Sequence, residues 1–370
     1  MRSGREQGRS TTGTTRGGDA VRRRRFAALL LVMGLVAGAC SNSNGGGGGQ
    51  EPSGGGEKKV KVALILPNAK DDFTWNQQAY EGAIAAEKAG SFDLDWVDNV
   101  GQDASSFIPV AERYAQEGYD LIIAHTFDYG EPVKQLADQY PDVDWAWAGS
   151  GIPDDLKQNV AVYEQPFYEG SFLAGILMAG ASKTGKVGAI AGFDIPACHS
   201  MVEGFHAGAM LFNKDIGFEA TYLGTWFDPA KEKEAALALY DAGVDIIGVC
   251  GTPTGVIEAA KEQNKGVIGY VNEQESAAPQ NVLTSVAWNT QLTFETMAAD
   301  VADGQFEPAK SYHVGLADGG IVVEPNPQYK DPIDQAALDL YHDVLAKVKS
   351  GAFEPPYIPE GSAEDVKVTI

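Results

Sequence analysis

From residue 58 onward, two kinds of segment follow each other along the chain. Short runs rich in β-branched residues are separated by longer segments whose apolar residues recur with the period of a helix. The short runs predict ten strands, at residues 59–67, 92–98, 119–126, 143–149, 159–165, 186–193, 219–226, 244–251, 266–272 and 281–288. The longer segments predict helices at residues 75–89, 105–117, 130–139, 167–181, 197–213, 229–242, 252–263 and 290–304. A further helix is predicted within "PIDQAALDLYHDVLAKVKSG". Repeated strand–helix units are typical of parallel sheets covered by helices on both faces.

The number and order of these units predict two lobes. Ten strands are too many for one ordinary open sheet, and the runs at 143–149 and 159–165 follow each other without a helix, which indicates a crossing from one sheet to another. The predicted fold class is therefore α/β, with two doubly wound parallel-sheet lobes joined by a hinge of about three crossings. In such sheets a ligand binds beyond the carboxyl ends of the strands.

Aromatic residues recur beside short polar residues at those strand ends. The groups are Trp75 with Asp72 and Asn76, Phe127 with Asp128, Trp226 and Phe227 with Asp228, and Trp288 with Asn289. A single aromatic is more often part of a core than a ligand contact, but four groups at strand ends favour a slot for a planar molecule. Stacking on an aromatic ring contributes about 1 to 3 kcal/mol per heteroaromatic base, and neighbouring Asn and Asp groups can read the ring edges.

The first 57 residues predict an export signal and a tether. Arg22 to Arg25, an apolar run from Phe26 to Val36 and small residues before Cys40 fit a lipoprotein signal peptide over residues 1–39, with lipidation at Cys40. Arg23, Arg24 and Phe26 also fit a twin-arginine signal, so the export route stays open, and a basic tail before a buried helix is the structural alternative. Residues 40–57 are Gly/Ser-rich and predict a flexible tether. We expect an exported protein held by lipid at the outer face of the cell membrane, or in a periplasm.

Charge and motifs narrow the class of function. The formal net charge of −23 disfavours nucleic acid as a partner. The sequence has neither a G-x-S-x-G elbow nor a metal-binding histidine spacing, and in "GASKTGKV" a valine replaces the hydroxyl that a phosphate-binding loop needs. We expect no enzyme activity, no cofactor and no metal. Cys198 and Cys250 could pair or remain buried thiols, and the sequence leaves both alternatives open.

Several longer segments together resemble the basic membrane protein (BMP) family of solute-binding lipoproteins that serve ABC importers. They are "FTWNQQAYEG", "EQPFYEGSFLAGILMAGASKTGKVGAIAGFDIP", "GTWFDPAKEKEAALALYDAGVDIIGVCG", "PQNVLTSVAWN" and "GLADGGIVVEPN", and the similarity runs from about residue 60 to residue 325. The resemblance implies a type I periplasmic-binding-protein fold. We expect one lobe from residues 58–163 and 288–326, and the other from residues 164–287 and 327–370.

The resemblance also implies a site. Characterised members hold a purine nucleoside between two aromatic rings, which correspond here to Trp75, in an aromatic–Asn pair with Asn76, and Trp226. Asp128 takes the place of an acidic base-reading residue, and Phe227 and Gly251 lie at neighbouring strand ends.

Two positions depart from the family pattern. Relatives carry an Asp and a Lys that are associated with the ribose, where this chain has Val271 and Ala317. Asn272 or Glu273 could substitute, and Trp288 resembles a subgroup whose ligand is a free base. We therefore favour a nucleobase over a nucleoside, delivered by a monomer to a membrane ABC permease. A ligand-sensing subunit that signals through a receptor, or a binder of another planar or sugar-like solute, is the alternative.

Overall fold

The computed structural model describes residues 59–149, 151–307 and 311–370. They belong to one compact unit, Gly56–Ile370. The predicted signal peptide (1–39), the lipidation residue Cys40 and the tether (40–57) lie outside the described residues.

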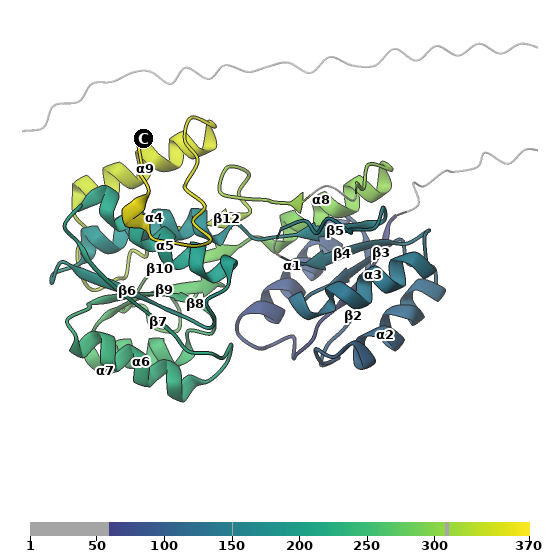
Figure 1. Ribbon diagram of the computed structural model, residues 1–370, viewed down its shortest axis with the longest axis horizontal. Helices are drawn as coiled ribbons and strands as arrows, with labels where there is room; N and C mark the ends of the chain where they lie inside the picture. The colour runs from purple at the N-terminus through teal and green to yellow at the C-terminus, as the bar shows by residue number, and fades with distance from the viewer. Residues whose placement is uncertain (1–58, 150, 308–310) are drawn as a thin grey trace, which may run out of the picture. The chain divides into compact units, whose positions relative to one another are not determined.

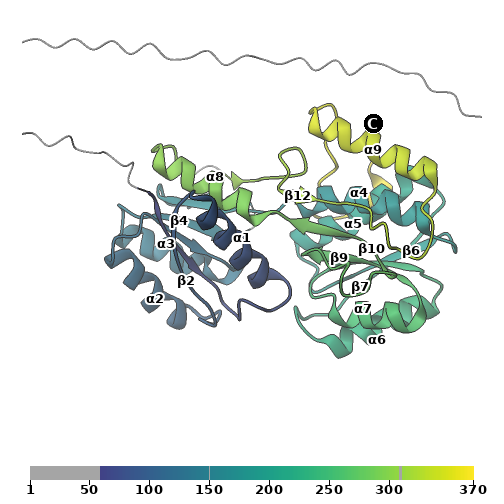
Figure 2. The ribbon, with the colours of Figure 1, turned by 180° about the vertical axis from the view of Figure 1, so that it is seen from behind.

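The first sheet consists of parallel strands from the amino-terminal half of this unit and one later strand (Figure 1). In spatial order its strands are β2 (Asp93–Val97), β1 (Lys61–Ile65), β3 (Leu121–Ala124), β4 (Asp144–Ala148), β5 (Val160–Tyr163) and β11 (Ser311–Tyr312). Helices α1 (Trp75–Ala89) and α8 (Thr290–Ala302) pack together on one face, as Figure 2 shows. Helices α2 (Ala104–Gln116) and α3 (Gly130–Gln139), the latter preceded by the short helix η1 (Phe127–Tyr129), cover the other face.

The second sheet repeats the same strand order. Its strands are β7 (Gly217–Tyr222), β6 (Lys186–Ala191), β8 (Ile246–Cys250), β9 (Gly266–Val271), β10 (Val282–Trp288) and β12 (Ile321–Val322). All pairs are parallel except β10 with β12. Helices α4 (Phe167–Ala181), α5 (Pro196–Phe212) and α9 (Gln335–Lys349) cover one face, and α6 (Pro229–Asp241) and α7 (Thr254–Gln263) the other.

Helix α4 is the central helix of the second lobe because nearly all of its residues are buried. Its close packing against α5 needs glycine: a Cβ at Gly208 would lie 1.9 Å from the Phe172 carbonyl oxygen, and one at Gly175 would lie 2.2 Å from that of Phe205. Helix α9 packs on α4, so the C-terminal helix belongs to the second lobe. The last short helix, η2 (Ala363–Asp365), contacts α5.

The predicted fold class is confirmed: the structure has two doubly wound sheets, and each of the ten predicted strands and nine predicted helices is present with ends shifted by a few residues. Strands β11 and β12 were missed because two-residue strands carry no periodic signal. The predicted crossing between the runs 143–149 and 159–165 is wrong, because β4 and β5 pair in the same sheet. Within the described residues the chain passes between the sheets after β5, after β10 and between β11 and β12. The lobe boundaries stay a prediction, and β12, which falls in a segment assigned to the first lobe, pairs with β10 of the second sheet.

Two further features concern cysteines and membranes. Cys198 and Cys250 form a disulfide, which decides between the two alternatives that the sequence left open.

Among the helices of the described residues, none combines the length and the apolar character that a membrane crossing requires.

Candidate ligand-binding site

The strand order fixes where a ligand crevice forms in each lobe. In the first sheet β1 lies between β2 and β3. The connection after β1 runs to one face of the sheet and the connection after β3 runs to the other, so the chain changes direction at a switch point between these two strands. In the second sheet β6 lies between β7 and β8 in the same way. Divergence at such a switch point leaves a crevice at the carboxyl ends of the strands, where doubly wound proteins bind ligands. We call the residues at these two points the first and second half-sites.

The first half-site is built around Trp75, the first residue of α1, and His125, which follows β3. The two rings stack, with centroids 4.6 Å apart and planes inclined by 19°. The Trp75 indole Nε1–H donates to the His125 carbonyl oxygen (3.1 Å). His125 Nε2 lies 3.1 Å from the Trp75 carbonyl oxygen. The stacking contact and the indole hydrogen bond thus hold the half-buried ring, and the second hydrogen bond joins the His125 ring to the Trp75 backbone.

The protonation state of His125 follows from its partners. Because the Trp75 carbonyl can only accept, Nε2 carries the proton, and Nδ1 accepts from the Tyr163 hydroxyl at 2.7 Å. Burial lowers the pKa of His125 to about 4, against a smaller upward contribution from the Trp75 carbonyl and the Asp72 carboxylate. The imidazole is therefore neutral at physiological pH and presents a flat face rather than a charge.

Asp72 organises the turn before α1. Its carboxylate accepts from the backbone N–H groups of Thr74 (3.0 Å), Asn76 (3.2 Å) and Gln77 (3.0 Å) and from the Asn76 side-chain amide (2.7 Å). These donors would otherwise lack partners at the helix start. Asp72 thus acts as the cap of α1, and its role as a ligand contact remains a prediction.

Two asparagines present carboxamide oxygens without a partner. Asn76 is 1% exposed, its amide nitrogen donates to Asp72, and its Oδ1 is buried with no hydrogen bond. Asn272, directly after β9, donates from Nδ2 to the Phe73 (2.9 Å) and Thr74 (3.4 Å) carbonyl oxygens, and its Oδ1 is likewise unpartnered. Since both amide nitrogens face acceptors, both orientations are fixed. Each oxygen can only accept, so it suits a ligand N–H or O–H donor.

The Asn272 bridge connects two residues with unusual backbone conformations. Phe73 has φ 65° and Val271 has φ 67°, a left-handed conformation that is rare for bulky or β-branched residues. Phe73 is also 75% exposed although it is a large aromatic. Strain of this kind costs about 1 to 3 kcal/mol per residue and gathers at ligand sites. The bridge links the first half-site to β9 of the second sheet.

Phe127 and Asp128 lie at the exposed edge of the first half-site, in η1. The Phe127 ring lies parallel to Trp75 at 6.2 Å between centroids. Trp147 holds this turn, since its Nε1–H donates to the Thr126 (3.0 Å) and Phe127 (3.1 Å) carbonyl oxygens. Asp128 is exposed and accepts from the Thr126 hydroxyl at 3.2 Å.

The second half-site is built around Trp226, in the loop after β7. The indole is 41% exposed and packs on Phe193 with ring centroids 4.9 Å apart. Its backbone carbonyl accepts from the Thr252 hydroxyl at 3.1 Å. Phe227 beside it is 66% exposed, and Gly251, with φ 143°, adopts a conformation that only glycine takes readily. Asp228 caps α6 through the Lys231 N–H (3.1 Å).

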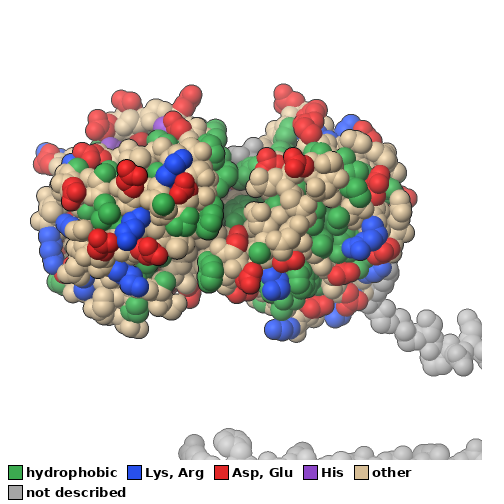
Figure 3. Space-filling view, turned by 90° about the horizontal axis from the view of Figure 1, so that it is seen from below, with side chains coloured by type: hydrophobic (Ala, Val, Ile, Leu, Met, Phe, Trp, Pro, Cys, Tyr) green, Lys and Arg blue, Asp and Glu red, His purple; other side chains and the backbone are tan. Residues whose placement is uncertain are grey.

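A cleft of about 840 Å³ runs beside the half-sites and is lined from both lobes. Predicted residues Asn272, Glu273 and Trp288 line it. Sequence reasoning missed the remaining polar and aromatic lining, which includes Phe73, Gln77, Gln78, Glu81, Glu258 and Lys261. Figure 3 shows the hollow in the surface, with hydrophobic side chains in green on both sides.

The structure therefore brings only part of the predicted set together. Trp75 and Trp226 do not line this cleft, and the ring contacts found among the described residues do not include one between them. Trp288 is 2% exposed; it lies 5.5 Å from Trp75 between ring centroids, and its Nε1–H donates to the Thr293 hydroxyl at 3.2 Å. It packs on the Trp75 ring and is also one of the cleft-lining residues.

Sequence reasoning also missed His125 and Phe193. His125 directly follows a predicted strand, and that position was the one available signal. Phe193 ends its predicted strand, so nothing in the pattern separated it from core residues. Within the described residues we find no group of three or more His, Cys, Asp or Glu side chains placed to hold a metal ion.

Comparison with known proteins gives a consistent result. The Bmp family model, described as "ABC transporter substrate-binding protein PnrA-like", matches residues 59–350. A purine-binding protein of Brucella abortus is 28% identical over 301 residues, 81% of this chain and 83% of its own. Basic membrane protein A of Borreliella burgdorferi is 29% identical over 276 residues, 72% of this chain and 80% of its own. A solved ABC transporter solute-binding protein from Conexibacter woesei has 25% identity and a TM-score of 0.68, covering 80% of this chain and 99% of its own.

The family match covers most of the chain and agrees with the two-lobed fold and the crevices at the strand ends. The resemblance seen in the sequence is thereby confirmed. The chain belongs to the Bmp family of PnrA-like substrate-binding proteins, which are not enzymes but bind a small molecule outside the cytoplasm for an ABC transporter permease.

Proposed function

We propose that this protein captures a purine-type ligand, a free nucleobase or a nucleoside, between Trp75 and Trp226, and delivers it to its permease. The observation that carries the proposal is the pairing of flat aromatic surfaces with fixed acceptor oxygens: Trp75 lies beside Asn76, whose Oδ1 has no partner. A purine offers both a π-face and N–H donors on its edge. A purine-binding relative at 28% identity supports the same ligand class.

Closure of the lobes brings the two indoles onto the ligand. The three crossings between the sheets serve as the hinge. The closed form is favoured only to the extent that the ligand contacts both lobes, so each indole contributes to closure as well as to affinity. Asn272 already reaches from β9 to the turn before Trp75, so it guides this movement.

Val271 and Ala317 support a free base over a nucleoside. Neither side chain can hydrogen-bond a ribose hydroxyl, and an unpaired ribose hydroxyl in a closed site reduces affinity. Asn272 and Glu273, which follow Val271 in the sequence, are polar residues of the cleft lining. Asp128, Phe227 and Gly251 complete the rim of the ligand site.

The lipid and the tether keep the captured ligand close to the membrane. Cys40 carries the lipid after removal of residues 1–39, and the Gly/Ser-rich residues 40–57 let a monomer swing between the medium and the permease. Metabolic labelling with a fatty acid tests this part: wild type is labelled, and Cys40→Ser is not.

Ligand class is tested with the full chain and a panel of adenine, guanine, hypoxanthine, adenosine, inosine, glucose and ribose. We expect a thermal shift and a calorimetric signal with at least one base. Trp226→Ala weakens that binding roughly tenfold to a hundredfold, because stacking is worth about 1 to 3 kcal/mol per ring. Tyr357→Ala, which removes a similarly exposed aromatic (47%), is the matched control and keeps wild-type affinity. Binding of a sugar with no response to purines would discard the purine assignment.

A further inference from the structure

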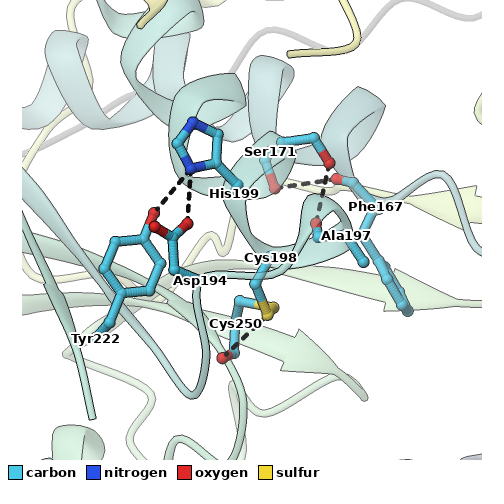
Figure 4. The surroundings of a disulfide bond; sticks show 9 residues. Phe167, Ser171, Asp194, Ala197, Cys198, His199, Tyr222 and Cys250 are labelled. Carbon is cyan, nitrogen blue, oxygen red and sulfur yellow. Dashed lines mark hydrogen bonds and ion pairs between the residues drawn. A yellow bond between two sulfur atoms is a disulfide. The ribbon is translucent and has the colours of Figure 1, made fainter. Parts of the chain in front are cut away.

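The disulfide of the second lobe lies at the switch point of its sheet. Cys250 is the last residue of β8, and Cys198 lies in the first turn of α5, which the loop after β6 enters. The two residues are 3% and 1% exposed. Figure 4 shows the bond between the start of α5 and the end of a strand. It therefore joins the loops that leave β6 and β8.

These two loops are the ones that hold Trp226. On one side the ring lies against Gly192, where an added Cβ would come within 2.7 Å of it. On the other side Thr252 donates to the Trp226 carbonyl oxygen at 3.1 Å. The loops also contact each other, since the Gly192 N–H donates to the Cys250 carbonyl at 2.9 Å.

The side chain of His199 also holds the loop between β6 and Cys198, through Asp194. Asp194 lies 2.7 Å from His199 Nδ1 (Figure 4). His199 Nε2 lies 2.9 Å from the Gly361 carbonyl oxygen. The loop that supports the Trp226 ring is thus fixed at both ends, by strand pairing of β6 and by α5 with its disulfide.

We infer that the Cys198–Cys250 disulfide and Thr252 are positioning elements of the ligand site, which set the place and angle of the Trp226 indole. The inference rests on the proposed function. It adds that capture depends on oxidation of this pair, so the reduced protein folds but binds its planar ligand weakly. Trp226 is 41% exposed, and its ring contacts Phe193 and Gly192 in the loop after β6, so its orientation depends on how that loop is held.

The test compares the oxidised wild-type chain with two variants. Cys198→Ser with Cys250→Ser removes the bond, and Thr252→Val removes the hydroxyl while leaving the bond intact. Thr184→Val is the matched control, because it removes a hydroxyl from the same lobe at the amino end of β6. Loss of one hydrogen bond predicts a Kd roughly threefold to tenfold higher for Thr252→Val, and we expect at least that for the serine pair. Thr184→Val keeps the wild-type Kd.

A readout without ligand separates this inference from the proposed function. Amide hydrogen exchange of a peptide spanning residues 223–228 should speed up in both variants and stay unchanged in Thr184→Val. If the oxidised wild type binds no purine, the proposed function fails while the exchange experiment still tests positioning. Wild-type exchange and wild-type Kd in the serine pair, together with a lower melting temperature, would show that the disulfide only stabilises the fold.

Discussion

The two half-sites differ in how their tryptophans are held. Trp75 is half-buried, stacks on a buried imidazole and donates its indole N–H to backbone. Trp226 is 41% exposed, makes one ring contact within the described residues, with Phe193, and is positioned by the loops around it. The first lobe thus offers an indole that is held by the core and by its own hydrogen bond, whereas the second offers a more exposed indole that is held through its loops.

This difference has a physical use in a protein that must close on its ligand and later release it. A preorganised surface loses little conformational entropy on binding, which favours affinity. A more exposed ring that is held from outside the core can part from the ligand without disturbing core packing. We therefore expect substitutions in the first half-site to affect stability and binding together, whereas substitutions in the second half-site affect binding alone.

Trp75→Ala should have the largest effect. It removes the ring that packs on His125 and Trp288, so we expect a loss of about 3 kcal/mol in the free energy of unfolding, as for large-to-small changes in cores, together with loss of ligand binding. Urea denaturation and calorimetry measure the two effects. Trp226→Ala is the comparison: its unfolding free energy should change by about 1 kcal/mol or less. Equal destabilisation by the two variants would remove the contrast between the lobes.

The pH dependence of stability should show the next largest effect, because each half-site has a histidine and the two pKa values shift in opposite directions. Burial lowers the pKa of His125 to about 4, so between pH 4 and pH 6.5 this histidine is protonated in the unfolded chain and neutral in the folded chain. This contribution is intact above pH 6.5 and is lost as the pH falls toward 4. Between pH 7 and pH 5 it amounts to about 2 kcal/mol.

His199 gives the opposite sign. Burial alone opposes its charge, but Asp194, the Gly361 carbonyl and Glu203 outweigh burial and raise its pKa. Its contribution is present below pH 6.5 and is lost as the pH rises through the folded value. The free energy of unfolding can be measured by denaturation at pH 5, 6, 7 and 8. Below pH 6.5 it should depend less on pH in His125→Gln than in the wild type, and above pH 6.5 it should depend less on pH in His199→Gln. Parallel profiles for the two variants would contradict the assignment.

Phe73→Gly should have the smallest effect, and it should be stabilising. The ring is 75% exposed and the backbone has φ 65°, which glycine adopts without strain. We expect a gain of about 0.5 to 1 kcal/mol in the free energy of unfolding, since relief of strain exceeds the added chain entropy. Ligand affinity should fall at the same time if Phe73 closes over the cleft that it lines. A destabilised variant would mean that the left-handed turn is not strained.

The sequence by itself determined the architecture. Strand and helix periods located helices such as α1, α3 and α4 at their observed bounds, because long amphipathic or apolar segments have few other ways to bury their surface. The doubly wound order and the position of Trp75 and Trp226 at strand ends followed from the same pattern. Two-residue strands such as β12 were not predicted, because such a strand forms only where the fold brings the segment beside another strand, here β10.

Only the tertiary structure decided what each side chain at the strand ends does. The sequence predicted Asp72, Asn76 and Trp288 alike as ligand contacts. In the structure Asp72 caps a helix, Asn76 has a side-chain oxygen without a partner, and Trp288 lies in the core. His125 and the pairing of Cys198 with Cys250 depend on contacts between segments dozens of residues apart. Local patterns report how a segment buries its surface, whereas hydrogen-bond partners at a crevice are set by which loops the sheet brings together.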